Sequence, residues 1–223
     1  GSTTNVGDND GEMGDKLAAV DLDGASATAV ACGCEFTCAL IDDGSVMCWG
    51  RNTWGQLGTG DDEDRYDDVG ETLVAVDLAG ASVSAIAAGE GHVCALLDDA
   101  TVKCWGHNDN GQLGLGDDVD RGATPDSLGA NLPAVELGVG DVPTAVDCGS
   151  LYTCVLLGDD SIKCWGDNGH GELGIGSKVN VGSSPTDMGA NLTAVDLGDT
   201  ATAIAAGGTT ACARLSDESV KCW

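Results

Sequence analysis

Cysteine is the residue type whose spacing most clearly suggests chemistry in this sequence. Eight of the 11 cysteines form four pairs, and the two members of every pair are ten positions apart. If the second hairpin turns through the three residues Asp98, Asp99 and Ala100, its two cysteines lie opposite each other, within reach of a disulfide bond. The sequence therefore predicts four disulfides, and the alternative is eight buried thiols that act as small apolar side chains. The predicted pairs are Cys38 with Cys48, Cys94 with Cys104, Cys154 with Cys164, and Cys212 with Cys222.

The histidines and serines do not form a catalytic or zinc-binding pattern. Cysteine pairs that are ten residues apart and lack histidine partners are not a zinc pattern. His92, His107 and His170 stand at different places relative to the cysteine pairs, so we do not expect them to converge on one metal ion. No G-x-S-x-G segment is present. The sequence therefore predicts no catalytic residue and no enzyme activity.

Two acidic loops could supply oxygen ligands. GDDEDRYDD at 60–68 and GDDVDRG at 116–122 bring carboxylates close together, as Ca²⁺ sites do. The order of an EF-hand loop is missing, and the corresponding loop at 176–182 reads GSKVNVG, so ordinary solvated turns are the favoured alternative. Calcium is the one cofactor that the sequence suggests, with the candidate ligands Asp61, Asp62, Asp64, Asp117, Asp118 and Asp120.

The net charge narrows the classes of partner. The chain has 37 acidic and 9 basic residues and a formal net charge of -28. Such a charge repels phosphate backbones and anionic lipid surfaces, so we expect no nucleic-acid partner. No apolar run approaches the roughly 18 residues that a membrane-spanning segment needs, so we expect no membrane span.

Tryptophan marks an internal repeat. Trp49, Trp105, Trp165 and Trp223 are separated by 56, 60 and 58 residues. Each repeat contains four short runs that favour β-strands, which in the first repeat read AVDL, ATAVACG, CALI and SVMCW. A period of this length with four strands per repeat is typical of β-propeller blades.

The segment around each tryptophan identifies a resemblance. The pattern WG-x-N-x-x-G-[QE]-L-G-x-G, which follows a D-[DG]-x-V-x-C-W strand, resembles the repeat of the RCC1 (regulator of chromosome condensation) family. The resemblance implies an all-β fold, a β-propeller with four-stranded blades. Members of that family usually have seven blades, and their loops mediate protein contacts, including nucleotide exchange on a small GTPase and inhibition of a secreted hydrolase.

The repeats predict the domain organisation. We expect residues 1–5 to be an N-terminal tail left by cloning and residues 6–223 to form one domain, with repeats at about 17–72, 73–131, 132–191 and 192–223. VGDNDGEMGD at 6–15 matches the segment that follows each tryptophan, so we expect residues 6–16 to complete the fourth repeat. This closure makes a four-bladed ring if it occurs within one chain, and an oligomer if it occurs between chains.

Three cysteines and one tryptophan depart from the repeat. Cys32 and Cys148 occupy the same position in the first and third repeats, near the expected axis, where a further disulfide could join them across the channel. Cys34 has no counterpart and is the candidate unpaired thiol. Trp54 stands outside the repeated positions and is either an exposed contact residue or a cover for a neighbouring strand.

These observations together predict a binding protein. Paired cysteines indicate an oxidising compartment, so we expect a secreted or cell-surface protein. The leading hypothesis is a non-catalytic extracellular scaffold that binds an unknown protein or surface ligand through its variable loops. The alternative is a self-associating structural subunit of an extracellular filament, coat or matrix. A secreted inhibitor or an exchange factor is less favoured.

Overall fold

Four antiparallel sheets of three strands make up the molecule. The computed structural model describes residues 8–66 and 73–223. The described residues contain no α-helix, only 3₁₀ turns at η1 (Gly14–Lys16), η2 (Pro125–Ser127), η3 (Gly129–Asn131) and η4 (Gly189–Asn191). The strands are β1 (Ala27–Cys32), β2 (Phe36–Ile41), β3 (Val46–Gly50), β4 (Val83–Ala88), β5 (His92–Leu97), β6 (Val102–Gly106), β7 (Pro143–Cys148), β8 (Tyr152–Leu157), β9 (Ile162–Gly166), β10 (Ala201–Gly207), β11 (Thr210–Leu215) and β12 (Val220–Cys222).

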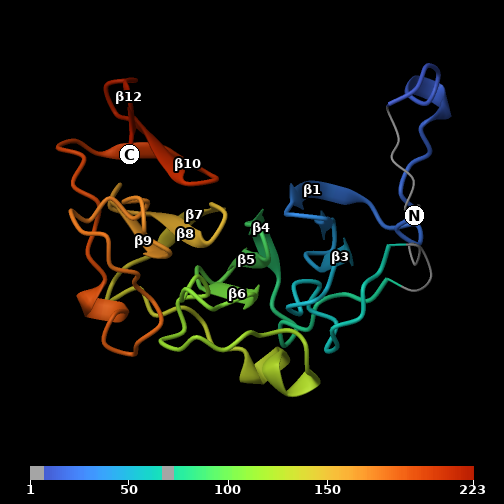
Figure 1. Cartoon of the computed structure of the whole chain (residues 1–223), viewed down its shortest axis with the longest axis horizontal. Coiled ribbons are helices and arrows are strands. Elements are labelled where there is room, and N and C mark those ends of the chain that lie inside the picture. The colour runs from blue at the N-terminus through green and yellow to red at the C-terminus, as the bar shows by residue number, and fades with distance from the viewer. Residues whose placement is uncertain (1–7, 67–72) are drawn as a thin grey trace.

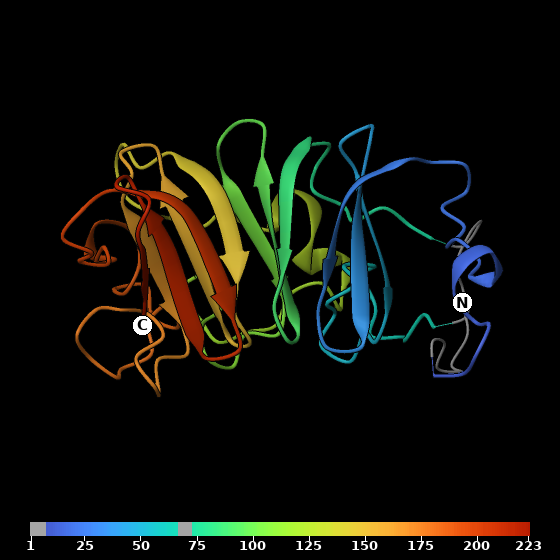
Figure 2. The same ribbon diagram turned by 90° about the horizontal axis from the view of Figure 1, so that it is seen from above.

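The sheets are arranged as the blades of a propeller. Figures 1 and 2 show them side by side along an arc, and the first strands β1, β4, β7 and β10 lie innermost. Neighbouring innermost strands are in contact: β1 with β4, β4 with β7, and β7 with β10. The prediction of an all-β propeller with one blade per repeat is therefore confirmed.

The arc is open. The segment from Asp8 to η1 lies at one end of the arc, and β12 lies at the other end in both views (Figures 1 and 2). Within residues 8–66 and 73–223, the structure shows neither a closed four-bladed ring nor residues 8–16 seated on the fourth blade; residues 1–7, which include the start of the expected closing segment, lie outside the described residues.

The blades have three strands rather than the expected four. The AVDL run of each later repeat follows the outer edge of the preceding blade instead of starting its own sheet. Ala75 makes a single bridge to Met47 of β3, and Ala194 makes the corresponding bridge to Lys163 of β9. One hydrogen-bonded contact per run is too few for a regular strand.

The hairpin register follows from the turns. Each second hairpin in a blade turns through three residues, and the third has a positive φ: 83° at Gly44, 61° at Ala100, 66° at Asp160 and 71° at Glu218. An Asp side chain in the turn accepts a backbone N–H two residues on, as Asp43 does from Ser45 at 2.9 Å. This odd turn length places Cys38 opposite Cys48.

The hydrophobic core lies between blades and not within them. Leu40 and Leu57 of the first repeat pack with Val93 and Trp105 of the second in one cluster. Two further clusters fill the second and third joints. Trp105 and Trp165 are fully buried, so each of these tryptophans fills the space between two blades.

A series of main-chain hydrogen bonds, here called the relay, joins the blades at the inner rim, at the turn between the first and second strands of each blade. Cys34 donates its N–H to the carbonyl of Glu90 at 3.1 Å, Glu90 donates to Ser150 at 2.9 Å, and Ser150 donates to Gly208 at 3.0 Å. Each donor lies in one blade and each acceptor in the next.

Among the described residues, no helix has the length and apolar character needed to cross a membrane.

Candidate binding surface

A buried asparagine holds each of the loops that follow Trp49, Trp105 and Trp165. Asn52 is fully buried; its Nδ2 donates to the carbonyl of Asp61 at 2.8 Å, and its Oδ1 accepts the N–H of Leu57 at 2.9 Å. Asn108 and Asn168 make the corresponding contacts in the next two loops. The polar atoms of these repeated side chains already have hydrogen-bond partners within their own loops. Binding of a specific partner must therefore depend on residues that differ between the loops.

Trp54 is the centre of one non-repeating cluster on this loop face. Its ring stacks on the ring of His107 from the next loop, with centroids 4.7 Å apart and an interplanar angle of 25°. The guanidinium carbon of Arg51 lies 4.5 Å from the centroid of the Trp54 ring. We call Arg51, Trp54, His107 and Asp109 the Trp54 cluster. It joins the first and second blades, and the third loop has Asp167 and His170 where the first has Arg51 and Trp54.

A glycine allows Trp54 to take this position. A Cβ atom on Gly91 would lie 2.6 Å from Cε3 of the Trp54 ring, so the indole packs directly on the Gly91 backbone. At the corresponding position the first repeat has Glu35, whose carboxylate lies 3.7 Å from the Arg51 guanidinium. Trp54 thus both covers a neighbouring strand end and stays half-exposed.

His107 is fixed as a hydrogen-bond donor. Gln112 accepts the N–H of Asn110 through Oε1 at 2.9 Å, so its Nε2, 3.1 Å from His107 Nδ1, must donate to that nitrogen. The remaining ring nitrogen, Nε2, therefore carries the proton and faces Asp109 Oδ2 at 3.1 Å. One ring nitrogen of His107 and one carboxylate oxygen each of Asp109 and Asp120 lie within 4.8 Å of one another, as metal ligands would. A ring nitrogen that carries a proton cannot bind a metal ion, so this arrangement does not fit a metal site through Nε2.

The carboxylates proposed for calcium have other roles. Asp61 forms a bidentate pair with Arg65 at 2.7 and 2.8 Å, and this pair lowers the pKa of Asp61 to about 2. Asp117 pairs with Arg121 at 2.6 Å. The third loop replaces both members of such a pair, with Ser177 and Val181.

The other acidic candidates divide into two groups. Asp64 accepts the N–H of Asn52 at 2.7 Å, Asp120 accepts the N–H of Asn108 at 2.7 Å, and Asn180 does the same for Asn168 at 2.9 Å. A neutral amide therefore serves as well as a carboxylate, which argues for loop closure and against Ca²⁺ binding. Asp62 and Asp118 are exposed. Burial raises the pKa of Asp120.

The eight paired cysteines lie where the hairpins place them. The structure contains all four disulfides, with Sγ atoms 2.09 to 2.14 Å apart and Cα atoms 4.1 Å apart. Three of them are buried between blades, whereas Cys222 at the end of the arc is exposed.

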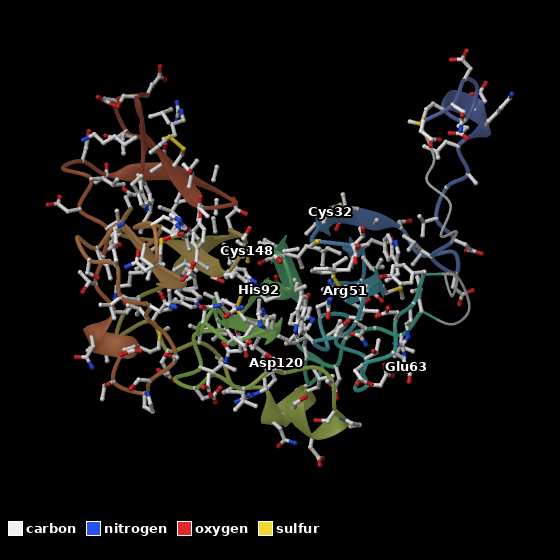
Figure 3. The ribbon with its side chains drawn as sticks, viewed as in Figure 1. Cys32, Arg51, Glu63, His92, Asp120 and Cys148 are labelled. Atoms are coloured by element: carbon white, nitrogen blue, oxygen red, sulfur yellow. A yellow bond between two sulfur atoms is a disulfide. The ribbon has the colours of Figure 1, made fainter. Side chains whose placement is uncertain are left out.

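Cys32 and Cys148 do not form the disulfide suggested by the sequence. Both thiols are free, as is Cys34, and they belong to blades separated by the β4–β6 sheet (Figure 3). All three line one hollow of about 440 Å³ at the inner rim. Cys148 is buried in the joint between the second and third blades, which is why its thiol does not reach across the arc.

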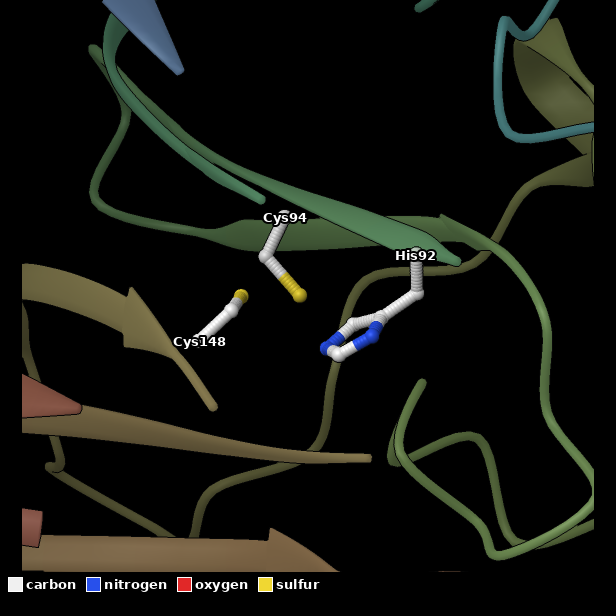
Figure 4. Close-up of side chains that lie close together, drawn as sticks. All are labelled: His92, Cys94 and Cys148. Atoms are coloured by element: carbon white, nitrogen blue, oxygen red, sulfur yellow. The ribbon is translucent and has the colours of Figure 1, made fainter. Parts of the chain in front are cut away.

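The thiol of Cys148 belongs to a buried cluster with His92 and Cys94, shown in Figure 4. Thr153 donates to the carbonyl of Gln112 at 2.9 Å, so His92 Nε2, 3.0 Å away, must donate to Thr153. Burial, with a smaller effect from His107, lowers the pKa of His92 to about 3. Cys94 is bonded to Cys104, so the cluster offers no thiolate from that residue, and burial raises the pKa of Cys148. The cluster is packing rather than a metal centre.

Sequence reasoning did not find the contact between Trp54 and His107. Each residue stood out as a departure from the repeat, but their equivalents in later loops are different, so no repeated spacing linked them. The sequence feature that could have indicated the contact is that Trp54 and His107 both differ from the repeat and lie in adjacent loops.

Comparison with known proteins agrees with the fold. The sequence matches the family described as the regulator of chromosome condensation (RCC1) repeat at residues 27–56, 83–112 and 144–172, and again at 43–96 and 101–156. The ultraviolet-B receptor UVR8 of Arabidopsis thaliana is 33% identical over 161 residues, which are 71% of this chain and 34% of that protein. The chain spans about a third or less of the length of the curated relatives it matches.

Solved structures show the same blade arrangement. Yeast RCC1 (Prp20), solved with Kap60, superposes with a TM-score of 0.68 at 22% identity over 90% of this chain and 44% of that one. The structure of Prp20p from Saccharomyces cerevisiae superposes with a TM-score of 0.61 at 20% identity over 82% of this chain and 42% of that one. The matched repeats and the propeller arc show that this chain belongs to the RCC1 repeat family.

Proposed function

We propose that this chain is a non-catalytic, disulfide-bonded scaffold that binds a protein partner through the Trp54 cluster. The observation that carries the proposal is that, in the part of the chain that the structure describes, an arginine, a tryptophan and a histidine from two neighbouring loops are in contact. Tryptophan and arginine are the residues that most often dominate protein interfaces. Arg51 and Trp54 lie in contact here, and the second and third loops have other residue types at both positions.

The charge around the cluster supports a basic partner. Asp109 has a side chain 76% exposed and Glu35 one that is 61% exposed, and they flank His107 and Arg51 respectively. In a chain of net charge -28, such a rim attracts positive segments and speeds their association. The yeast relative Prp20p binds Gsp1p and histones, which supports protein binding by a propeller of this type.

Four disulfides support an oxidising compartment as the place of action. Disulfides in hairpins persist in secreted and cell-surface proteins and are rare where thiols are kept reduced. We therefore propose a secreted or cell-surface protein. Mass spectrometry of the protein from its native source, alkylated before reduction, would show the eight cysteines protected; alkylation of all eight would contradict this location.

The binding proposal is tested with a fluorescent oligo-arginine peptide as the probe of a basic partner. Trp54→Ala should weaken binding by about 30-fold, the effect of losing one interface hot spot of about 2 kcal/mol. His170→Ala is the matched control, because His170 holds the same loop position in the third repeat and its side chain is 74% exposed. If both variants bind the peptide equally, attraction by overall charge explains binding and the cluster has no role.

A second variant tests the geometry of the cluster without removing any of its side chains. Gly91→Ala places a methyl group 2.6 Å from the Trp54 ring and should displace the indole, reducing peptide binding and changing the near-ultraviolet circular dichroism. Gly169→Ala is the control, since its added Cβ meets only Asp167 at 3.8 Å or more. Unchanged binding by Gly91→Ala would show that the position of Trp54 does not matter.

A further inference from the structure

A free thiol lies beside a disulfide in the joint between the second and third blades. Cys148, at the end of β7 in the third blade, is 5% exposed and packs in the same hydrophobic cluster as Cys94 and Cys104 of the second blade. The Sγ of Cys148 lies within 4.8 Å of the Sγ of Cys94, which is bonded to Cys104 (Figure 4). A sulfur that can attack a disulfide and the disulfide itself are thus neighbours across one joint.

Thr153 lies against both sulfurs. Its hydroxyl donates to the carbonyl of Gln112 at 2.9 Å, so Oγ1 can only accept from other groups. It accepts from His92 Nε2 at 3.0 Å and from the Cys148 thiol at 3.9 Å. The same Oγ1 lies 3.6 Å from the Sγ of Cys94. Because His92 Nε2 already carries a proton, this histidine is no base for the thiol, and the proton of Cys148 must leave to solvent.

The hollow at the inner rim gives solvent a path to this thiol. Cys148 is one of the residues that line the hollow, with Gly89 and Ser150 from the two blades of the same joint. Burial, with a smaller effect of the Asp147 carboxylate, raises the pKa of Cys148, and a backbone hydrogen bond from Cys94 lowers it by less. The thiolate is the form that attacks a disulfide, so the reaction should be slow near neutral pH and faster in alkali.

We propose that Cys148 attacks Cys94 and so transfers a disulfide from within the second blade to the joint between the second and third blades. A bond forms between the sulfurs of Cys148 and Cys94 as the bond between Cys94 and Cys104 breaks. The proton of Cys148 passes to water, and the departing Cys104 thiolate takes up a proton, so the exchange needs no oxidant or reductant. The product joins two blades covalently, whereas each hairpin disulfide lies within one blade. This inference does not depend on the Trp54 cluster.

The two bonds close loops of very different length. Cys94 and Cys104 are ten positions apart, whereas Cys94 and Cys148 are 54 positions apart. In an unfolded chain the longer loop closes about ten-fold less often than the shorter one. The bond between Cys94 and Cys148 should therefore accumulate in the folded protein, where the joint holds the two sulfurs together, and not in denaturant.

The first and third joints provide internal controls. At the position of Cys148 the second and fourth blades have Ala88 and Ala206. Each of these alanines packs in a cluster that contains the hairpin disulfide of the preceding blade. The joints thus bring this position to a disulfide three times, and the second joint supplies a thiol there. The hairpin disulfides of the first and third blades should therefore stay unchanged while the second exchanges.

The test uses the full chain with Cys32→Ala/Cys34→Ala, in which Cys148 is the remaining free cysteine. The folded protein is incubated at several values between about pH 6 and about pH 9, acid stops the exchange, and N-ethylmaleimide then labels the free thiol in denaturant. The label should move from Cys148 to Cys104 during incubation. Because the thiolate attacks, the rate should rise about ten-fold per pH unit.

Tryptic peptides locate the new bond. Trypsin separates the three sulfurs, because Lys103 and Arg121 lie between them in the sequence. The peptides are 66–103, 104–121 and 122–163. We expect 66–103 to be linked to 104–121 before incubation and to 122–163 after it, which mass spectrometry without reduction distinguishes.

Cys148→Ala in the same background is the matched control, because alanine is the residue at the equivalent positions 88 and 206. It should keep the bond between Cys94 and Cys104 at every pH. A label that stays on Cys148 throughout, or a bond from Cys148 to Cys104, would overturn the proposal. A rate that depends on protein concentration, an equal yield in denaturant, or exchange of the first and third hairpin disulfides would also overturn it, because the joint would then not direct the reaction.

Discussion

Trp105 donates its indole N–H to the main-chain carbonyl of Gln56 at 3.0 Å, so the second blade is bonded directly to the loop that follows the first. Trp165 makes the same bond to Gln112 at 2.9 Å, and Trp223 bonds to Glu172 at 2.8 Å. The repeated tryptophan is thus both the filler of the joint and its polar link.

Replacing these tryptophans by phenylalanine should have unequal effects. The carbonyl of Gln112 also accepts a hydrogen bond from Thr153 at 2.9 Å, whereas within residues 8–66 and 73–223 the Gln56 carbonyl accepts one from Trp105 alone. Trp105→Phe should therefore reduce the free energy of unfolding by about 1 kcal/mol more than Trp165→Phe, because it leaves a buried carbonyl without a partner. Urea unfolding of both variants measures the difference, and equal losses would contradict it.

The disulfides should contribute according to their burial. All four close loops of ten residues, for which the chain-entropy account gives about 2.5 to 3 kcal/mol each. Replacing Cys154 and Cys164 by alanine should cost more than replacing Cys212 and Cys222, because the first pair is buried and leaves a cavity. Thermal unfolding of the two double variants should place the Cys154 and Cys164 variant lower.

His92 should make the protein sensitive to acid. Its pKa is lowered to about 3 in the folded state, while the unfolded chain takes up a proton near pH 6.5. Between these values the free energy of unfolding should fall by up to about 1.4 kcal/mol per pH unit as the pH decreases. His92→Phe, which carries the residue found at position 36, should remove this contribution, with His170→Phe as the exposed control.

The free energy of unfolding of wild type and of His92→Phe is measured by urea unfolding at several pH values between 7 and 4, and the difference between the two proteins is followed against pH. Other groups titrate in this range: burial raises the pKa values of Asp120 and Asp147, which has the opposite effect on stability. Those groups remain in both proteins and cancel. A pH dependence that is identical in His92→Phe and wild type would contradict the prediction.

Asp61 should matter at lower pH. Its bond to Arg65 depresses the pKa to about 2 from 3.8, so the stability it provides is present above about pH 4 and is lost as the pH falls towards 2. Because the Asp61 side chain is 37% exposed, solvent screening limits this to about 1 kcal/mol or less. Asp61→Asn should flatten the acid limb of the melting temperature against pH, and Asp62→Asn should not.

The sequence was informative wherever a feature recurs. The tryptophan spacing predicted the blades, and the constant cysteine spacing predicted pairs that the hairpin register brings together, as at Cys38 and Cys48. These features recur because every joint has the same shape, so each position is constrained several times along one chain.

The sequence could not predict structural features that occur only once in the chain. The stacking of Trp54 on His107 depends on the angle between two loops, and the environment of Cys148 depends on which blade its thiol faces. The open arc depends on how neighbouring blades are oriented, which the spacing of residues along the chain does not encode. The three-stranded sheets could not be read from strand propensity, because AVDL is β-prone whether it makes one bridge or many.

The hydrogen-bond relay at the inner rim uses only main-chain atoms, and the four residues that form it are Cys34, Glu90, Ser150 and Gly208, four different types. Since the frame needs nothing from their side chains, mutation can change the chemistry of the central opening without disturbing the blades. Side chains at these four turns, which line the hollow at the inner rim, can therefore be exchanged without loss of the bonds between blades.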